Sequence, residues 1–448
     1  MLNPEQAQAR AAQAIERARA QGADAADAIL IADTALSVSV RLGALEDVGR
    51  SEGGELGLRV FVGKRSASVA TSDLSDAALD AVAERAVAMA RLAPEDDWAG
   101  LAPAERLMKG AAPLLDLDDG ADVSPEALKA QALAAEDTAR AVAGVTNSEG
   151  GGASASRAVI ALATSHGFAG SYAVTSHGVS ASVLAGTGSG MQRDYAHHSA
   201  RHRAALDAPE AIGRLAGERA VARLDPARIA SGPMPVVFDP RVGSSLLGHL
   251  TGAIAGPGVA RGTSFLRDAL GSAVFAPGVT IRDDPHRPQG LRSRPFDGEG
   301  LPVSPLAIVE DGVLQSWLLE SASARQLGLE PTGHATRGIG GAPGVGTSNL
   351  YMDAGRITPE ALIADIERGV LVTELIGQGV NGVTGDYSRG AAGFLIENGE
   401  ITRAVAEITI AGNLRAMFAA LVPASDLEFR YGVNVPTLRI DGMTVAGG

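Results

Sequence analysis

The stretch "GQGVNGVTGDYSRGAAGFLIENGEITRAV", from Gly377 to Val405, decides how the C-terminal part of the chain is interpreted. Its first six residues match GxGxxG, a pattern that in dinucleotide-binding proteins opens a helix holding the pyrophosphate. Here Gly385 and Gly390 interrupt any such helix, and Asn398-Gly399 is the preferred two-residue turn of a β-hairpin. We therefore expect strands instead of a nucleotide-binding helix, with glycines that allow positive φ angles or close backbone approach.

The sequence around this stretch predicts an α+β fold in two parts. The best linker is "DPARIASGPMP" (Asp225–Pro235), which separates an N-terminal α/β region of residues 1–230 from a C-terminal, mainly β region of residues 231–448. The N-terminal region, with sub-segments of about 1–115 and 116–230, alternates helical periodicity with antiparallel strand patterns.

Capping residues and apolar periodicity bound several elements of the first sub-segment. Residues 4–21 predict a helix, residues 27–43 a strand, and residues 55–72 two strands around a turn at Gly63-Lys64. We expect Ser75 to cap a helix with one apolar stripe. The stripe consists of Leu79, Val82, Ala83, Ala86, Val87 and Ala90.

The second sub-segment predicts two helices on either side of a meander of short strands. Ser124-Pro125 starts a helix that reaches about Ala143, with proline at the first helical position. After the meander, Asp207 and Glu210 are expected to form a capping box for a helix of roughly 208–224.

Composition and charge exclude several classes of function. The 448 residues carry a formal net charge of −14, which disfavours contact with phosphate backbones, so we expect no nucleic-acid partner. The chain has no cysteine, which excludes disulfides, thiolate metal ligands and a cysteine nucleophile. The N-terminus lacks the apolar segment of a signal peptide, and no run of about 18 apolar residues predicts a membrane helix. We therefore expect a cytoplasmic protein.

Two short motifs resemble catalytic or metal-binding patterns but fit their surroundings poorly. Ser51 in "GRSEG" matches GxSxG, yet a strand instead of a helix follows it, so we interpret Ser51 as a turn residue. His198 and His202 would face one ion only if they lay on a helix. Their segment continues the strand meander, where residues four apart are separated by about 13 Å, and solvated histidines are the favoured interpretation.

Three other residues carry chemistry that the sequence does not resolve. His249 lies in the apolar segment "GSSLLGHLTGAIAG", where a lone histidine is usually a packed core residue. Asp386 and Arg389 in "GDYSRG" either pair with each other or present one charge each to a ligand. An ion pair that fastens the loop is the favoured interpretation.

The segment Gly379–Leu414 resembles the signature of the TldD/PmbA family, in its PmbA branch, which is also called TldE. Supporting stretches include "GELGLRVFVGKRSASVATSDLS", "GHLTGAIAG" and "NVPTLRIDGMTVAGG", and the similarity spans roughly residues 25–448. The resemblance implies an N-terminal α/β region followed by a region rich in curved antiparallel β-sheet. It also implies metallopeptidase action on small, unstructured peptides. An older label of the family is "modulator of DNA gyrase".

In the TldD branch, the resemblance implies a zinc ion bound by HExxxH and a later cysteine. The matching segment here is "LLGHLTGA" (Leu246–Ala253), and neither of its two registers supplies two ligands and a base. One register places Gly248 and Ala253 at the histidines. The other takes His249 as the first histidine and places Ile254 at the second. Because the third ligand is also absent, we predict no metal and no catalytic residue in this chain.

These observations predict a metal-free, non-catalytic subunit of a peptidase assembly, with zinc only in a TldD-like, HExxxH-bearing partner. The subunit would help wall a chamber for small unstructured peptides. A stand-alone peptidase with a reorganised site and a homodimeric peptide-binding module are the alternatives. The candidate residues for the peptide cleft or the subunit interface are His249, Asn381, Asp386, Arg389 and Asn413.

Overall fold

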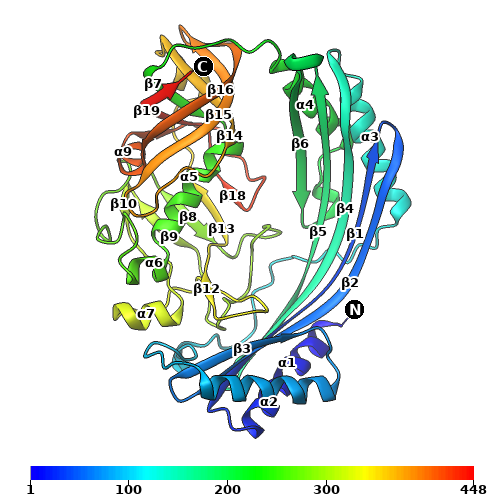
Figure 1. Cartoon of the computed structure of the whole chain (residues 1–448), viewed down its shortest axis with the longest axis vertical. Helices are drawn as coiled ribbons and strands as arrows, with labels where there is room; N and C mark the ends of the chain where they lie inside the picture. The colour runs from blue at the N-terminus through cyan, green and yellow to red at the C-terminus, as the bar shows by residue number, and fades with distance from the viewer. Residues whose placement is uncertain (1, 448) are drawn as a thin grey trace.

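The computed structural model describes residues 2–447, and its N-terminal region is built on one antiparallel sheet of six strands in the order β3-β2-β1-β4-β5-β6. The strands are β1 (Ala25–Arg41), β2 (Ala44–Val62), β3 (Arg65–Thr71), β4 (Val145–Thr164), β5 (Ala169–Ala185) and β6 (Gln192–Ala200). Four of them are longer than the usual 3–10 residues, reaching 20 residues in β4. The sheet bends into an arc whose concave side faces the C-terminal region (Figure 1).

Helices pack against this sheet near its two ends (Figure 1). They are α1 (Pro4–Ala20) and α2 (Asp76–Leu92) at one end, and α3 (Pro125–Arg140) and α4 (Pro209–Ala222) at the other. The predicted cap of α2 is confirmed, because the Ser75 side chain accepts a hydrogen bond from the N–H of Ala78. All six residues of its predicted stripe are buried. The first and third helices also begin where the sequence placed them.

The strands of the predicted meander are long instead of short, since β4 has 20 residues and β5 has 17. Two other N-terminal predictions are also wrong. Asp207 does not cap α4, since Ala208 is the N-cap without a side-chain bond, and Asp207 instead accepts from Arg430 at 2.5 Å in the C-terminal region. Ser51 is not in a turn, because β2 begins well before residue 55 and pairs Ser51 with Ala35 of β1. In both places long-range contacts override the local preference of the residues.

The C-terminal region contains a six-stranded sheet in the order β16-β15-β14-β7-β19-β17, which closes into a barrel because β16 also pairs with β19. Its strands are β7 (Gly232–Phe238), β14 (Arg368–Ile376), β15 (Asp386–Glu397), β16 (Glu400–Asn413), β17 (Leu421–Pro423) and β19 (Leu438–Ala446). The predicted hairpin is confirmed. Asn398 (φ 52°) and Gly399 (φ 80°) join β15 to β16 in the left-handed conformations of a type I′ turn.

A second sheet, β10-β9-β8-β13-β18, and short helices complete the C-terminal region. Its strands are β8 (Ile281–Asp284), β9 (Leu306–Glu310), β10 (Val313–Leu314), β13 (Asn349–Met352) and β18 (Val433–Asn434), beside the small pair β11 (Ala335–Thr336) and β12 (Gly344–Val345). The helices are α5 (Pro240–Ala253), α6 (Gly256–Ala260), α7 (Ser321–Leu327), α8 (Pro359–Ile363) and α9 (Leu414–Ala419). One apolar core joins both sheets and α5. The predicted α+β class is confirmed.

A buried ion pair and further hydrogen bonds connect the two regions. The Asp27 carboxylate of β1 accepts hydrogen bonds from Arg59 at 2.6 Å and from Arg337 of the C-terminal region at 3.0 Å. Arg325 of α7 donates to the backbone carbonyls of Trp98 and Leu101 at 2.8 and 3.0 Å. The C-terminal region is thus fastened both to strand β1 of the N-terminal sheet and to the segment that follows α2. None of the helices within residues 2–447 combines the length and the apolar character that a membrane crossing requires.

Candidate functional site

Helix α5 presents His249 to strand β15. The helix begins after Asp239, whose carboxylate accepts a hydrogen bond from the N–H of Arg241 at 2.9 Å, and Pro240 occupies its first turn. Its apolar face is buried through Leu246, Leu247 and Leu250. The His249 ring lies edge-on to the Tyr387 ring, with centroids 5.8 Å apart and an interplanar angle of 79°.

Tyr387 and Arg389 share one face of β15, because alternate residues of a strand point to the same side. The exposed fractions of the two residues are 2% and 8%. The Arg389 Nε donates a long hydrogen bond of 3.4 Å to the Ile376 carbonyl. Among residues 2–447, no carboxylate lies within ion-pair distance of this guanidinium. Arg389 is therefore a buried cation without a counter-charge from the described chain.

The cluster of His249, Tyr387 and Arg389 contains buried polar atoms that have no hydrogen-bond partner. Burial lowers the pKa of His249, and the nearby charge of Arg389 lowers it further, so the ring is neutral near pH 7. Burial raises the pKa of Tyr387 to about 12, against the opposing effect of Arg389. Within the described residues, neither the His249 Nε2 nor the Tyr387 hydroxyl has a hydrogen-bond partner. Leaving such groups unpaired costs about 1–3 kcal/mol each, so this cluster carries polar atoms that the described chain does not compensate.

The cluster does not fit a catalytic zinc ion. His249 is its one metal-ligating side chain, whereas such an ion takes about three protein ligands. The positive charge of Arg389 also opposes a divalent cation at this place. In the part of the chain that the structure describes, no group of three or more His, Cys, Asp and Glu side chains is arranged to hold a metal. The side chains present are suited to bind polar or anionic groups.

The other three candidates lie together at the end of β15. Asn413 donates to the Asp386 carboxylate and to the Thr384 carbonyl, both at 3.1 Å, and the N–H of Asn381 donates to the Asp386 carbonyl at 2.9 Å. The predicted ion pair between Asp386 and Arg389 is wrong, because residues three apart on a strand point to opposite faces. Asp386 instead accepts a hydrogen bond from the Thr384 hydroxyl at 2.6 Å.

The glycines of this loop have the two predicted roles. Gly377 and Gly385 have φ angles of 78° and 83°, which favour glycine. A Cβ on Gly379 would overlap the Ser388 carbonyl of β15. The GxGxxG pattern leads into strand β15 and not into a helix, so the nucleotide-binding interpretation stays rejected.

His198 and His202 do not share a ligand position. His198 lies in β6, and its Nδ1 accepts a hydrogen bond from the N–H of Asp207 at 3.0 Å. His202 lies beyond the end of that strand, with its Nε2 at 3.0 Å from the Asp116 carbonyl. The segment is a strand as predicted as far as Ala200, but the interpretation of solvated histidines is wrong, because both side chains are largely buried and hydrogen-bonded.

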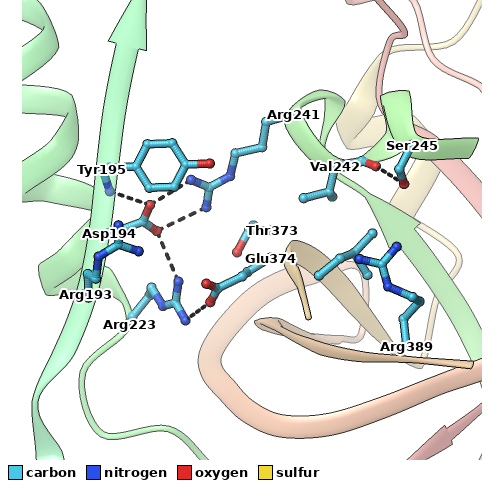
Figure 2. Close-up of a pocket in the computed structure, with 11 residues that line it drawn as sticks. Arg193, Asp194, Tyr195, Arg223, Arg241, Val242, Ser245, Thr373, Glu374 and Arg389 are labelled. Carbon is cyan, nitrogen blue, oxygen red and sulfur yellow. Dashed lines mark hydrogen bonds and ion pairs between the residues drawn. The ribbon is translucent and has the colours of Figure 1, made fainter. Parts of the chain in front are cut away.

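A cavity of about 260 Å³ opens beside Arg389, between the two regions (Figure 2). Its polar lining comes from β6, the end of α4, α5, β14 and β15. These residues are Arg193, Asp194, Tyr195, Arg223, Arg241, Ser245, Thr373, Glu374 and Arg389. The cavity therefore joins the edge strand β6 of the N-terminal sheet to the strand that carries Tyr387 and Arg389.

Asp194 of β6 is the centre of an ion-pair network at this cavity. Its side chain is 2% exposed and accepts from the two terminal nitrogens of Arg241 at 2.8 and 3.1 Å, while a terminal nitrogen of Arg223 lies at 3.5 Å. Burial alone would raise the pKa of Asp194, but the hydrogen bonds and charge of Arg241 outweigh it and lower the pKa. Arg223 also pairs with Glu374. Sequence reasoning missed this network, although an acid flanked by basic residues in "QRDYAHH" was a signal for it.

Profiles of three domains from one peptidase family match most of this chain. The profile "PmbA/TldA metallopeptidase domain 1" matches residues 26–90, the central-domain profile residues 118–224, and the C-terminal-domain profile residues 231–447. The chain is also 39% identical over 426 residues to the protein named Metalloprotease PmbA of Escherichia coli O157:H7, covering 95% of this chain and 92% of that protein. The chain belongs to the PmbA/TldD metallopeptidase family.

Further members of the PmbA/TldD family agree in sequence and fold. A protein named Metalloprotease PmbA homolog of Haemophilus influenzae is 37% identical over 439 residues, covering 97% of this chain and 94% of that protein. A crystal structure from Bacteroides thetaiotaomicron VPI-5482, named for modulation of DNA gyrase, has a TM-score of 0.92 at 28% identity over 100% of both chains. TldE from Thermococcus kodakarensis has a TM-score of 0.87 over 98% of this chain and 100% of its own, and at 21% identity it shows the fold alone. The named relatives support a peptidase-type role for this chain.

Proposed function

We propose that this chain is a metal-free, non-catalytic subunit of a PmbA/TldD-type peptidase that acts on small, unstructured peptides. Its partner would be a TldD-like chain that carries the HExxxH motif and the zinc ion. One observation carries the proposal. Helix α5 resembles the zinc-binding helix of the TldD branch, yet it brings a single histidine, His249, to Tyr387 and Arg389. A chain without cysteine forms no disulfides, so a cytoplasmic assembly is part of the proposal.

The exposed face of α5 supports a close approach by another chain. Gly248 and Gly252 lie four residues apart on this face, and a Cβ added to either would meet no atom within 4 Å. A glycine inside a helix costs roughly 1 kcal/mol relative to alanine. Packing within residues 2–447 gives no reason for that cost. A peptide or a partner subunit lying against the helix backbone would supply one.

The loop between β14 and β15 offers a second contact surface. Ile376 at the end of β14 and Val383 on the loop expose 59% and 57% of their surface. The hydrogen bond between Asn413 and Asp386 fixes the base of the loop. Exposed apolar side chains on an ordered loop suit a subunit interface. A second copy of this chain is the alternative occupant of this surface.

Co-expression of this chain with a HExxxH-bearing relative tests the proposal. We expect the two chains to copurify, and peptide cleavage to require both. Replacing the partner's motif glutamate by glutamine should abolish cleavage. Chelator-sensitive cleavage by this chain alone would contradict the proposal and establish a stand-alone peptidase.

A matched pair of variants tests the loop. Val383→Asp should weaken copurification, because it places a charge in the proposed interface. Ile401→Asp is the control, since Ile401 is 51% exposed at the far end of the β15–β16 hairpin. Equal copurification of both variants with the partner would exclude the loop from the interface.

A further inference from the structure

We propose that the cavity beside Arg389 binds a carboxylate group of a peptide (Figure 2). The proposal rests on the peptide-handling role above and deepens it, because it names the chemical group that this chain recognises. Three independent features of the cavity support it: its charge balance, the burial of Arg389, and the unsatisfied polar atoms in its lining.

The charge balance leaves one guanidinium without a counter-ion. Four arginines line the cavity, and three of them have carboxylate partners. The pairs are Arg241–Asp194, Arg223–Glu374 and Arg193–Glu149. The fourth is Arg389, which has no ion pair among residues 2–447. The cavity therefore has room for one additional negative charge, within a chain whose formal net charge is −14.

Because Arg389 is buried, the absence of a counter-charge beside it is unfavourable. Arg389 is 8% exposed, and a buried cation without a counter-charge is strongly disfavoured. Its one hydrogen bond within the described chain, 3.4 Å from Nε to the Ile376 carbonyl, leaves the terminal nitrogens unused. Figure 2 shows the guanidinium across the cavity from the Asp194 network. A carboxylate can accept two parallel hydrogen bonds from such a planar group.

Further polar atoms surround the same space. Thr373 is 6% exposed, and its hydroxyl has no partner among the described residues. The Nε of Arg241 is likewise buried and unpaired within residues 2–447. Val242 and Leu375 give the cavity an apolar wall against which the carbon chain of a peptide residue can pack. The lining thus combines anion-binding groups with a surface for an amino-acid side chain.

A carboxylate suits this cavity better than a phosphate. Asp194 and Glu374 place two negative charges in the lining, and they would repel the second charge of a phosphate group. The volume of about 260 Å³ holds a carboxylate and the residue that carries it, since one water molecule takes about 30 Å³ in the liquid. The carboxylate has two sources in peptides, namely the C-terminus and the side chains of aspartate and glutamate.

Calorimetric titration of the isolated full-length chain distinguishes these sources. The probes are N-acetylated tetra-alanine as the free acid, the same peptide as its C-terminal amide, and an amidated peptide with one alanine replaced by glutamate. Binding of the free acid without binding of the simple amide identifies the C-terminus. Binding of the amidated glutamate peptide identifies a side chain. Equal binding of the free acid and the simple amide overturns the proposal.

Arg389→Gln is the decisive variant, and Arg403→Gln is its control. We expect Arg389→Gln to weaken carboxylate binding at least about tenfold, because a charge-assisted hydrogen-bond pair is lost. Arg403 lies in the same sheet with a side chain that is 65% exposed, and its replacement should leave binding unchanged. Equal binding by Arg389→Gln and the unaltered chain would refute the site.

Measurements of folding and of assembly distinguish a failure of the carboxylate site from a failure of the proposed function. Removal of an uncompensated buried charge should leave the Tm of Arg389→Gln equal to that of the unaltered chain or higher. A thermal shift of the unaltered chain by the free acid, but not by the amide, tests the site without any variant. If no carboxylate peptide binds while the two-chain assembly still cleaves peptides, only the carboxylate site is wrong. Stoichiometric zinc in the isolated chain would instead overturn the subunit proposal.

Discussion

Replacing Asp194 by asparagine tests how firmly the two regions are held together. Asp194 belongs to β6 of the N-terminal sheet, whereas Arg241 belongs to α5 of the C-terminal region. Their side chains are 2% and 12% exposed, and the carboxylate accepts two hydrogen bonds from the guanidinium. Asp194→Asn keeps the shape of the side chain but leaves the Arg241 charge buried without its partner.

The expected loss of stability depends on the interactions that remain in the Asp194→Asn variant. Breaking a buried ion pair by removing one charge costs about 3–5 kcal/mol. Arg223 keeps its pair with Glu374, and the asparagine oxygen can still accept the backbone N–H that Asp194 accepts from Tyr195 at 2.8 Å. We therefore expect the low end of the range, about 3 kcal/mol, which for a chain of 448 residues corresponds to a fall in Tm of about 3 °C.

Urea unfolding with a matched control measures this loss. Asp365→Asn makes the same chemical change at an ion pair with Arg439, but the Asp365 side chain is 73% exposed, so we expect less than about 1 kcal/mol. Adding Arg241→Gln to Asp194→Asn should restore part of the stability, because the uncompensated charge is removed. The reasoning is refuted if Asp194→Asn and Asp365→Asn have the same midpoint.

Three further predictions concern single residues elsewhere in the chain. Burial raises the pKa of Glu299 to about 7, from an ordinary value of 4.5, so protons favour the folded state and stability falls as the pH rises from about 4.5 to about 7. Urea unfolding at pH 5 and pH 8 should show the unaltered chain losing about 2–3 kcal/mol more than Glu299→Gln, and parallel losses would contradict this. Gly379→Ala should destabilise the chain by about 1–3 kcal/mol, because its Cβ overlaps a carbonyl of β15, whereas Gly382→Ala meets no atom within 4 Å and should be tolerated, as paired thermal melts will reveal. Tyr387→Phe should be neutral or stabilise by up to about 1 kcal/mol, because the hydroxyl has no partner in the described chain, and a clear loss in urea unfolding would point to a hidden partner.

The elements that the sequence predicted correctly have local signals. The stripe of α2 repeats with the helical period, and Ser75 marks its start, so no distant contact was needed to place it. The hairpin at Asn398-Gly399 depends on two adjacent residues that accept positive φ angles. His249 and Arg389 were both candidates, and the structure brings them to the same cluster.

The predictions that were wrong concern contacts between residues that are distant in the sequence or depend on strand pairing. The first part of β2 is polar and mostly exposed, so its sequence carries no strand pattern, and its pairing with β1 makes it a strand. The Asp386–Arg389 pair was expected in a loop, but β15 begins at Asp386 and separates the two side chains onto opposite faces. Asp194 and Arg241 meet only because the two regions pack together. The basic residues around Asp194 indicated an ion pair, but no pattern within either segment identified Arg241 as the partner.

Zinc analysis of the purified proteins tests the central claim most directly. The account predicts no stoichiometric zinc in this chain when it is purified alone, and about one zinc ion per assembly when a HExxxH-bearing partner is present. Stoichiometric zinc in the isolated chain, lost when His249 is replaced by alanine, would contradict it.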